Sequence, residues 1–147
     1  MAASITKFDD AFEYKVIVDT SCSNTAVENV TAEPGYIYSI SLDNAGSQSD
    51  SYFKFFDAAD VTMGTTVADM VLKIKANSRY VFEIPKGLYF TYLSFACTAN
   101  PNPADNTAVG GGVVVRISVG KTKYTAQNIS QNIESGESSS PDLGAYE

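Results

Sequence analysis

Short segments in which apolar and polar residues alternate constrain this chain more than any other feature of its sequence. In residues 113–119, four aliphatic side chains alternate with Arg116 and Ser118. Successive side chains of a β-strand point to opposite faces, so this period of two predicts a half-buried strand. Residues 36–42 show the same period, which predicts one buried face and one polar face with Ser39 and Ser41. The predicted buried residues are Val113, Val115, Ile117 and Val119 in the first segment, and Tyr36, Tyr38, Ile40 and Leu42 in the second.

Five further segments have strand character, and turn-forming residues separate them. The further strands are expected at residues 12–19, 51–57, 70–75, 80–84 and 88–98. Segment 88–98 carries apolar residues on both faces, which is typical of a strand in the middle of a sheet or crossing between two sheets. Turns rich in Gly, Pro and Asn are expected at 34–35, 43–46, 76–78, 85–87, 100–103 and 110–112. With no amphipathic helix between strands, the pattern predicts an all-β fold, an antiparallel β-sandwich of seven to eight strands resembling a jelly roll.

The chain of 147 residues has the size of one domain, and its ends differ from its middle. We expect an extended N-terminal arm over 1–11, the β-sandwich over 12–119 and an extended polar C-terminal tail over 120–147. The tail is serine-rich and has no positive charge after Lys123, a composition that cannot bury enough apolar surface to fold by itself. Its few large apolar residues are therefore the predicted anchors in a partner groove. They are Tyr124, Ile129, Ile133, Leu143 and Tyr146.

Charge and hydropathy argue against several kinds of partner. The net charge is −7, and Lys and Arg form no run that could follow a phosphate backbone, so nucleic-acid binding is not expected. No stretch of 18 apolar residues predicts a membrane span. The first ten residues lack the apolar core of a secretion signal, so we expect a product made in a cytoplasm.

The residues that usually carry catalysis or bind cofactors are scarce. Histidine is absent, which excludes histidine-based nucleophile and metal arrangements. Four acids, Asp57, Asp60, Asp69 and Glu83, could form a glycosidase pair, and Asp57 with Asp60 could bind calcium. The chain has no Trp that could stack on a sugar, and it has no loop with the closely spaced acids of a dedicated calcium site. These four acids are therefore interpreted as solvated loop residues. We expect no enzyme activity, no catalytic residue, no metal and no cofactor.

Two other groups of residues leave alternatives open. Cys22 and Cys97 lack the further ligands that a zinc site requires, so they are either small buried apolar residues or a disulfide. A set of tyrosines on alternating positions could stack on sugars or a protein partner, although aromatic rows of this kind more often belong to a core. This set is Tyr36, Tyr38, Tyr52 and Tyr92.

Residues 52–119 resemble the small β-sandwich structural proteins of tailed bacteriophages. The segments that carry the resemblance are 53–57 (FKFFD), 61–66 (VTMGTT), 71–75 (VLKIK), 82–90 (FEIPKGLYF), 104–108 (ADNTA) and 112–117 (GVVVRI). The resemblance implies a virion component, in particular a capsid decoration or cement protein that binds the major capsid protein on the outer surface of the head. It implies no catalytic residues.

Long arms on a compact body further suggest a homo-oligomer, with a trimer as the first expectation and a dimer as the second. Two other functions remain open at this point. A tail, neck or fibre component of the same virion would share the fold, and a carbohydrate-binding module would also be an aromatic-rich sandwich.

Overall fold

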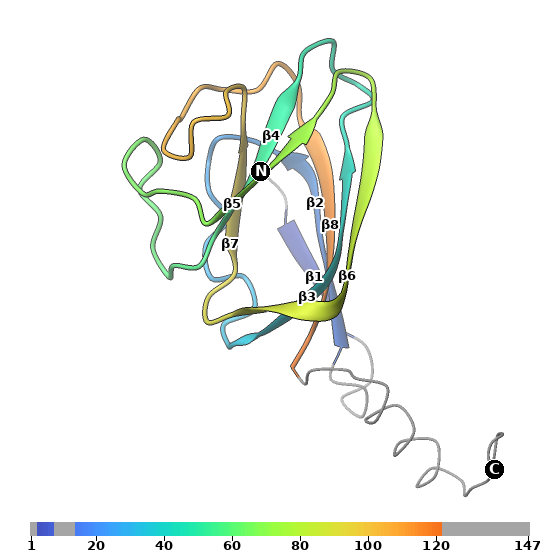
Figure 1. Cartoon of the computed structure of the whole chain (residues 1–147), viewed down its shortest axis with the longest axis vertical. Helices are drawn as coiled ribbons and strands as arrows, with labels where there is room; N and C mark the ends of the chain where they lie inside the picture. The colour runs from blue at the N-terminus through green and yellow to red at the C-terminus, as the bar shows by residue number, and fades with distance from the viewer. Residues whose placement is uncertain (1–2, 8–13, 122–147) are drawn as a thin grey trace, which may run out of the picture.

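The computed structural model describes residues 3–7 and 14–121, which form two antiparallel sheets packed face to face (Figure 1). The strands are β1 (Ala3–Lys7), β2 (Tyr14–Cys22), β3 (Gly35–Asp43), β4 (Ser51–Phe56), β5 (Met70–Ile74), β6 (Arg79–Phe90), β7 (Ser94–Thr98) and β8 (Val113–Gly120). One sheet has the order β1-β2-β8-β3-β6, and the other has the order β5-β4-β7. The predicted all-β antiparallel sandwich is confirmed.

The strand pairs nest inside one another in the manner of a jelly roll. Strand β4 pairs with β5, β3 pairs with β6, and β2 pairs with β8. Between β2 and β3 the chain crosses to the three-stranded sheet, where Val27 and Phe95 exchange two backbone hydrogen bonds of 2.8 and 2.9 Å. This bridge takes the place of a further strand beside β7. The jelly-roll character predicted from the sequence therefore follows from the pairing of the strands.

Part of the predicted N-terminal arm belongs to the larger sheet. Strand β1 lies within residues 1–11 and pairs antiparallel with β2, from Ala3 opposite Asp19 to Lys7 opposite Lys15. The other residues of that arm lie outside the described residues, as does the C-terminal tail beyond Lys121.

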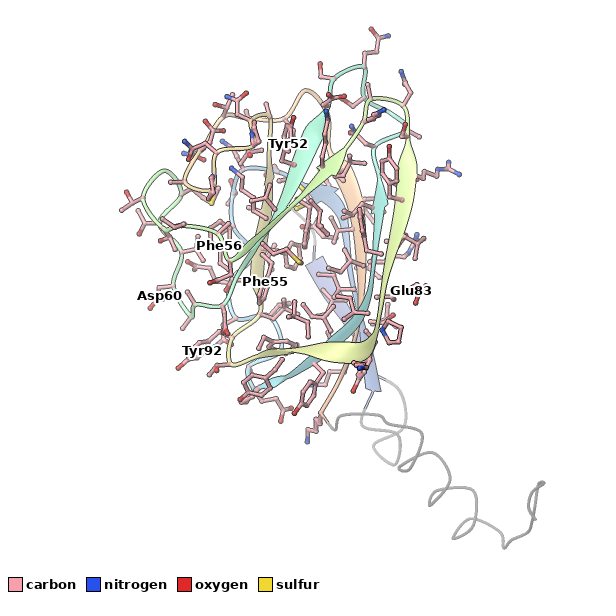
Figure 2. The ribbon with its side chains drawn as sticks, in the orientation of Figure 1. Tyr52, Phe55, Phe56, Asp60, Glu83 and Tyr92 are labelled. Carbon is pink, nitrogen blue, oxygen red and sulfur yellow. The ribbon has the colours of Figure 1, made fainter. Side chains whose placement is uncertain are left out.

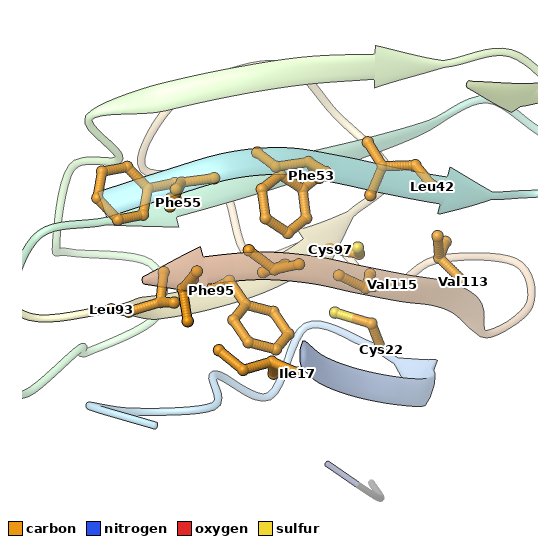
Figure 3. Close-up of a cluster of buried hydrophobic side chains, with 14 of the residues drawn as sticks. Ile17, Cys22, Leu42, Phe53, Phe55, Leu93, Phe95, Cys97, Val113 and Val115 are labelled. Atoms are coloured by element: carbon orange, nitrogen blue, oxygen red, sulfur yellow. The ribbon is translucent and has the colours of Figure 1, made fainter. Parts of the chain in front are cut away.

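The inner faces of the two sheets form one hydrophobic core (Figure 3). The rings of Phe53 and Phe95, both in the three-stranded sheet, stack with centroids 5.9 Å apart. Strand β8 has the predicted faces: its four odd-numbered aliphatic residues are buried and Arg116 is exposed. The largest fully buried apolar side chains are Phe53, Phe56, Phe90, Phe95, Ile17, Ile37, Ile40, Leu42, Ile74, Leu93 and Ile117.

Strand β3 corrects the predicted buried face of residues 36–42. Ile37 is fully buried, whereas Tyr36 and Tyr38 are half-buried on the outer side of the sheet. The pairing with β8 moves from Ile37 opposite Val119 to Ser39 opposite Ser118, so Tyr38 is an extra residue in a β-bulge. Such a bulge reverses the alternation of faces. The prediction was therefore right for Ile40 and Leu42 and wrong for the two tyrosines.

Strand β6 corrects two further boundaries. Residues 85–87 do not separate two strands, because they bulge within β6, which continues to Phe90. Pro85 has no N–H group to donate to a neighbouring strand, and Gly87 has a φ of +79°. Both residues are therefore suited to a β-bulge. The predicted strand 88–98 divides after Phe90, and its second half is β7 in the other sheet. Of the two alternatives for this segment, crossing between sheets is confirmed.

The core also contains a carboxylate. Asp19 in β2 is fully buried, and its Oδ1 accepts a 3.0 Å hydrogen bond from the Ser21 N–H. Its Oδ2 is buried with no donor among the described residues. Burial raises the pKa of the Asp19 carboxyl above its usual value of 3.8, and the Ser21 N–H opposes part of that rise.

We expect Asp19→Asn to raise the free energy of unfolding by about 1 kcal/mol at pH 7, because it removes a desolvated charge and keeps the acceptor for Ser21. In the native protein, the folded state binds the Asp19 proton more tightly than the unfolded state. The buried Asp19 charge therefore destabilises the folded state at pH values above the pKa that Asp19 has in that state. This destabilisation disappears as the pH falls toward 3.8. Urea unfolding of both proteins at pH 7 and pH 3.5 checks this. A variant no more stable than the native chain at pH 7 would contradict it.

Candidate interaction surface

Three tyrosines gather on the outer face of the five-stranded sheet. The rings of Tyr36 and Tyr89 meet edge to face with centroids 5.4 Å apart, and those of Tyr36 and Tyr38 lie 6.4 Å apart. Tyr89 is 53% exposed. We call Tyr36, Tyr38 and Tyr89 the tyrosine cluster. Aromatic side chains with an apolar ring and a polar hydroxyl are enriched in the contact surfaces of proteins, so this cluster is the candidate interaction surface.

The bulge in β6 holds the backbone close to this cluster. A Cβ atom on Gly87 would lie 3.0 Å from Cε1 of Tyr38 and 3.2 Å from Cβ of Tyr36. Gly87 also has a positive φ, which residues with a side chain rarely adopt. The glycine therefore permits both the backbone conformation and the close approach of β6 to the tyrosine rings.

The cluster lies at the end of the sheet where the described part of the chain ends. Tyr36 is paired with Gly120 of β8 on one side and with Tyr89 of β6 on the other. The next residue, Lys121, forms an ion pair of 3.5 Å with Glu33. The last described residues, Gly120 and Lys121, thus lie beside the cluster. The five predicted tail anchors lie in residues 122–147, outside the described residues.

The structure separates the other two tyrosines of the predicted set from this cluster. Tyr52 lies in β4 of the three-stranded sheet, and Tyr92 lies between β6 and β7 with 39% exposure. Figure 2 shows these two residues toward opposite ends of the molecule. Sequence reasoning missed Tyr89, although its position between Leu88 and Phe90, which both face the core, would have placed it on the outer face.

The four acids singled out in the sequence do not form one site. Oδ1 of Asp57 accepts hydrogen bonds from the N–H groups of Thr91 (3.0 Å) and Tyr92 (2.8 Å). Oδ2 of Asp69 accepts a 2.7 Å hydrogen bond from the Asp57 N–H. Asp60 and Glu83 lie on opposite sides of the molecule (Figure 2). Within residues 3–7 and 14–121, no group of three potential metal ligands among Cys, Asp and Glu lies close enough to hold a metal ion.

A buried cation, which the sequence analysis did not single out, fixes the loop over the three-stranded sheet. Lys54 in β4 is fully buried, and its Nζ donates hydrogen bonds to the carbonyl oxygens of Asn102 (2.5 Å) and Asp105 (3.2 Å). Burial lowers the pKa of the Lys54 ammonium, and the charge of Asp105 opposes this. Lys54 therefore holds loop 99–112 against the outer face of β4.

We expect Gly87→Ala to lower the free energy of unfolding by about 1 to 2 kcal/mol, because the added methyl meets the tyrosine rings and the positive φ becomes strained. Gly46→Ala is the matched control, since a Cβ there has no atom within 4 Å. It should change the stability by less than about 0.5 kcal/mol. Urea unfolding of both variants measures the difference. Equal stabilities would show that Gly87 does not constrain the cluster.

Comparisons of this chain with protein-family models, curated proteins and solved structures found no match. Among the residues that the structure describes, no helix is long and apolar enough to cross a membrane. Support for a function therefore comes from the fold, the tyrosine cluster and the composition of the tail.

Proposed function

We propose that this chain is a non-enzymatic structural protein of a tailed-phage virion, most specifically a decoration or cement protein that binds the major capsid protein on the outer surface of the head. The observation that carries the proposal is the placement of the tyrosine cluster beside Gly120, where the polar tail continues from a jelly-roll body. One end of a rigid domain thus combines an aromatic contact surface with an arm that can reach a neighbouring subunit.

The architecture supports this proposal by analogy. Jelly rolls with two sheets occur in viral capsid proteins, where closed sandwiches present fixed surfaces for assembly. They also occur in lectins, so the fold alone does not decide between these functions.

The use of polar side chains supports a structural function. Asp57 and Asp69 bind backbone N–H groups of the loops between strands, and Lys54 binds backbone carbonyls. Each group thereby fixes a loop to the sandwich. A body with fixed loops loses little conformational entropy when it binds, which favours a protein that joins neighbouring subunits.

The tail supplies the second contact of the proposal. It contributes acidic charge and the five anchors Tyr124, Ile129, Ile133, Leu143 and Tyr146. Burial of each anchor in a partner groove could contribute about 1.5 to 3 kcal/mol. A homo-oligomer, with a trimer first and a dimer second, would place several such tails on one patch of the shell.

The exposure of the tyrosine cluster also fits a second function, that of a carbohydrate-binding module. Tyr89 is 53% exposed, and its ring could stack on a sugar as in a carbohydrate-binding module. Loss of a glycan-array signal in Tyr89→Ala, with Tyr92→Ala as the control on another part of the surface, would favour this module. A third possibility, a tail, neck or fibre component, keeps the fold and changes only the partner in the virion.

The decoration proposal predicts that removal of residues 124–147 leaves the melting temperature nearly unchanged, because the described core ends with β8. The same truncation should weaken binding to capsids that lack this protein by at least tenfold, since one lost anchor already corresponds to about that factor. Co-sedimentation with such capsids, over a range of protein concentrations, measures the binding.

Two variants of the full chain sharpen this test. Replacing Leu143 and Tyr146 by Ala should reproduce part of the loss, whereas replacing Ser138, Ser139 and Ser140 by Ala should not. A truncated protein that decorates capsids as tightly as the full chain would overturn the role of the tail.

A further inference from the structure

The two cysteines, far apart in the sequence, come together from opposing sheets. Cys22 is the last residue of β2 in the five-stranded sheet, and Cys97 lies in β7 of the three-stranded sheet. Both side chains are fully buried as free thiols. Figure 3 shows both sulfur atoms within the hydrophobic core between the sheets.

Backbone hydrogen bonds fix the two cysteines as neighbours. The Cys97 N–H donates a 2.8 Å hydrogen bond to the carbonyl oxygen of Ser23, the residue after Cys22. Farther along, Val27 and Phe95 exchange two hydrogen bonds, so the segment that follows β2 runs antiparallel to β7. The crossing between sheets thus begins beside Cys97.

The two thiols also interact directly. A side-chain hydrogen bond with Cys97, together with burial, raises the pKa of the Cys22 thiol well above its usual value. The negative charge of Asp19 adds to that rise. The Cys22 thiol is therefore protonated in the folded protein at neutral pH.

From this arrangement we propose that Cys22 and Cys97 are a disulfide-forming pair that joins the two sheets when the protein meets a small-molecule disulfide such as oxidised glutathione. One cysteine thiolate attacks the glutathione disulfide, forming a mixed disulfide and releasing one glutathione thiolate. The second cysteine thiolate then displaces the other glutathione and forms the Cys22–Cys97 bond. Two protein thiols are oxidised, one glutathione disulfide is reduced to two glutathione thiols, and the cysteine protons pass to the released thiolates.

The bond would have a large effect because it joins the two layers across a long segment of chain. The loop that it closes spans about 75 residues and contains β3 to β6, and cross-links over long loops restrict the unfolded chain most. For a domain of this size we expect a rise in melting temperature on the order of 10 °C. Because both thiols are buried and the pKa of the Cys22 thiol is raised, the reaction should be slow in the folded state and fast during refolding.

The test uses the full chain, unfolded and then refolded in buffers with defined ratios of reduced to oxidised glutathione. After equilibration, free thiols are blocked with an alkylating agent, and the intact mass is measured. Under oxidising ratios we expect a monomer that has lost two hydrogens and binds no alkylating group. The oxidised protein should melt on the order of 10 °C above the same sample treated with a reductant.

Cys22→Ala and Cys97→Ala are the matched controls, because each leaves one thiol without its neighbour. Each variant should melt at the same temperature with and without reductant, and its remaining thiol should stay free or carry glutathione. The proposal would be overturned if the native chain at oxidising ratios kept two free thiols, carried two glutathione adducts or formed disulfide-linked dimers. So would an oxidised monomer that melts no higher than the reduced one. These readouts come from the native chain, so the test holds even where an alanine variant fails to fold.

Discussion

Contact between the inner faces of the two sheets is the interaction on which the rest of the structure depends. Apolar side chains from β8, β3 and β6 in one sheet pack against Phe53, Phe55 and Phe95 in the other. Burial of these side chains removes much apolar surface from water, which is the main favourable contribution to folding. The nested pairing of the strands allows the chain to form both faces, because it passes from one sheet to the other several times. Each crossing then becomes a loop at a fixed place on the surface.

The two outer faces differ as a result. Over the three-stranded sheet, loop 99–112 is held by Lys54, and the loop after β4 is held through Asp57 and Asp69. On the five-stranded sheet, the tyrosine cluster and Val81, which is 61% exposed, face outward. The outer face of the three-stranded sheet is therefore covered by loops, one of which exposes Val67 (63%), whereas the strands of the five-stranded sheet themselves carry exposed apolar side chains. We regard the outer face of the five-stranded sheet as the one suited to a partner. Gly120, near the end of the described chain, lies beside the tyrosine cluster on this sheet.

Local patterns in the sequence predicted most of the strands and the two faces of β8, because the alternation of apolar and polar side chains within a strand does not depend on the strands that it pairs with. They failed where a neighbouring strand determines the geometry. The bulge at Tyr38 depends on pairing with β8 and β6, so alternation alone placed two tyrosines on the wrong face. The proximity of Cys22 and Cys97 depends on how the chain crosses between sheets, which sequence spacing does not reveal. The predicted tail anchors stay predictions, because they lie outside the described residues.

Our central proposal is that this jelly roll is a repeated structural part of a phage shell. The most direct measurement is the number of copies of the chain in purified particles, counted against the major capsid protein by quantitative mass spectrometry with labelled standard peptides. We predict a copy number in a fixed ratio to the capsid subunits, with the chain accessible to protease on intact heads. A copy number of only a few per particle would indicate a neck, tail or fibre component, and absence from particles would show that the chain is not a virion protein.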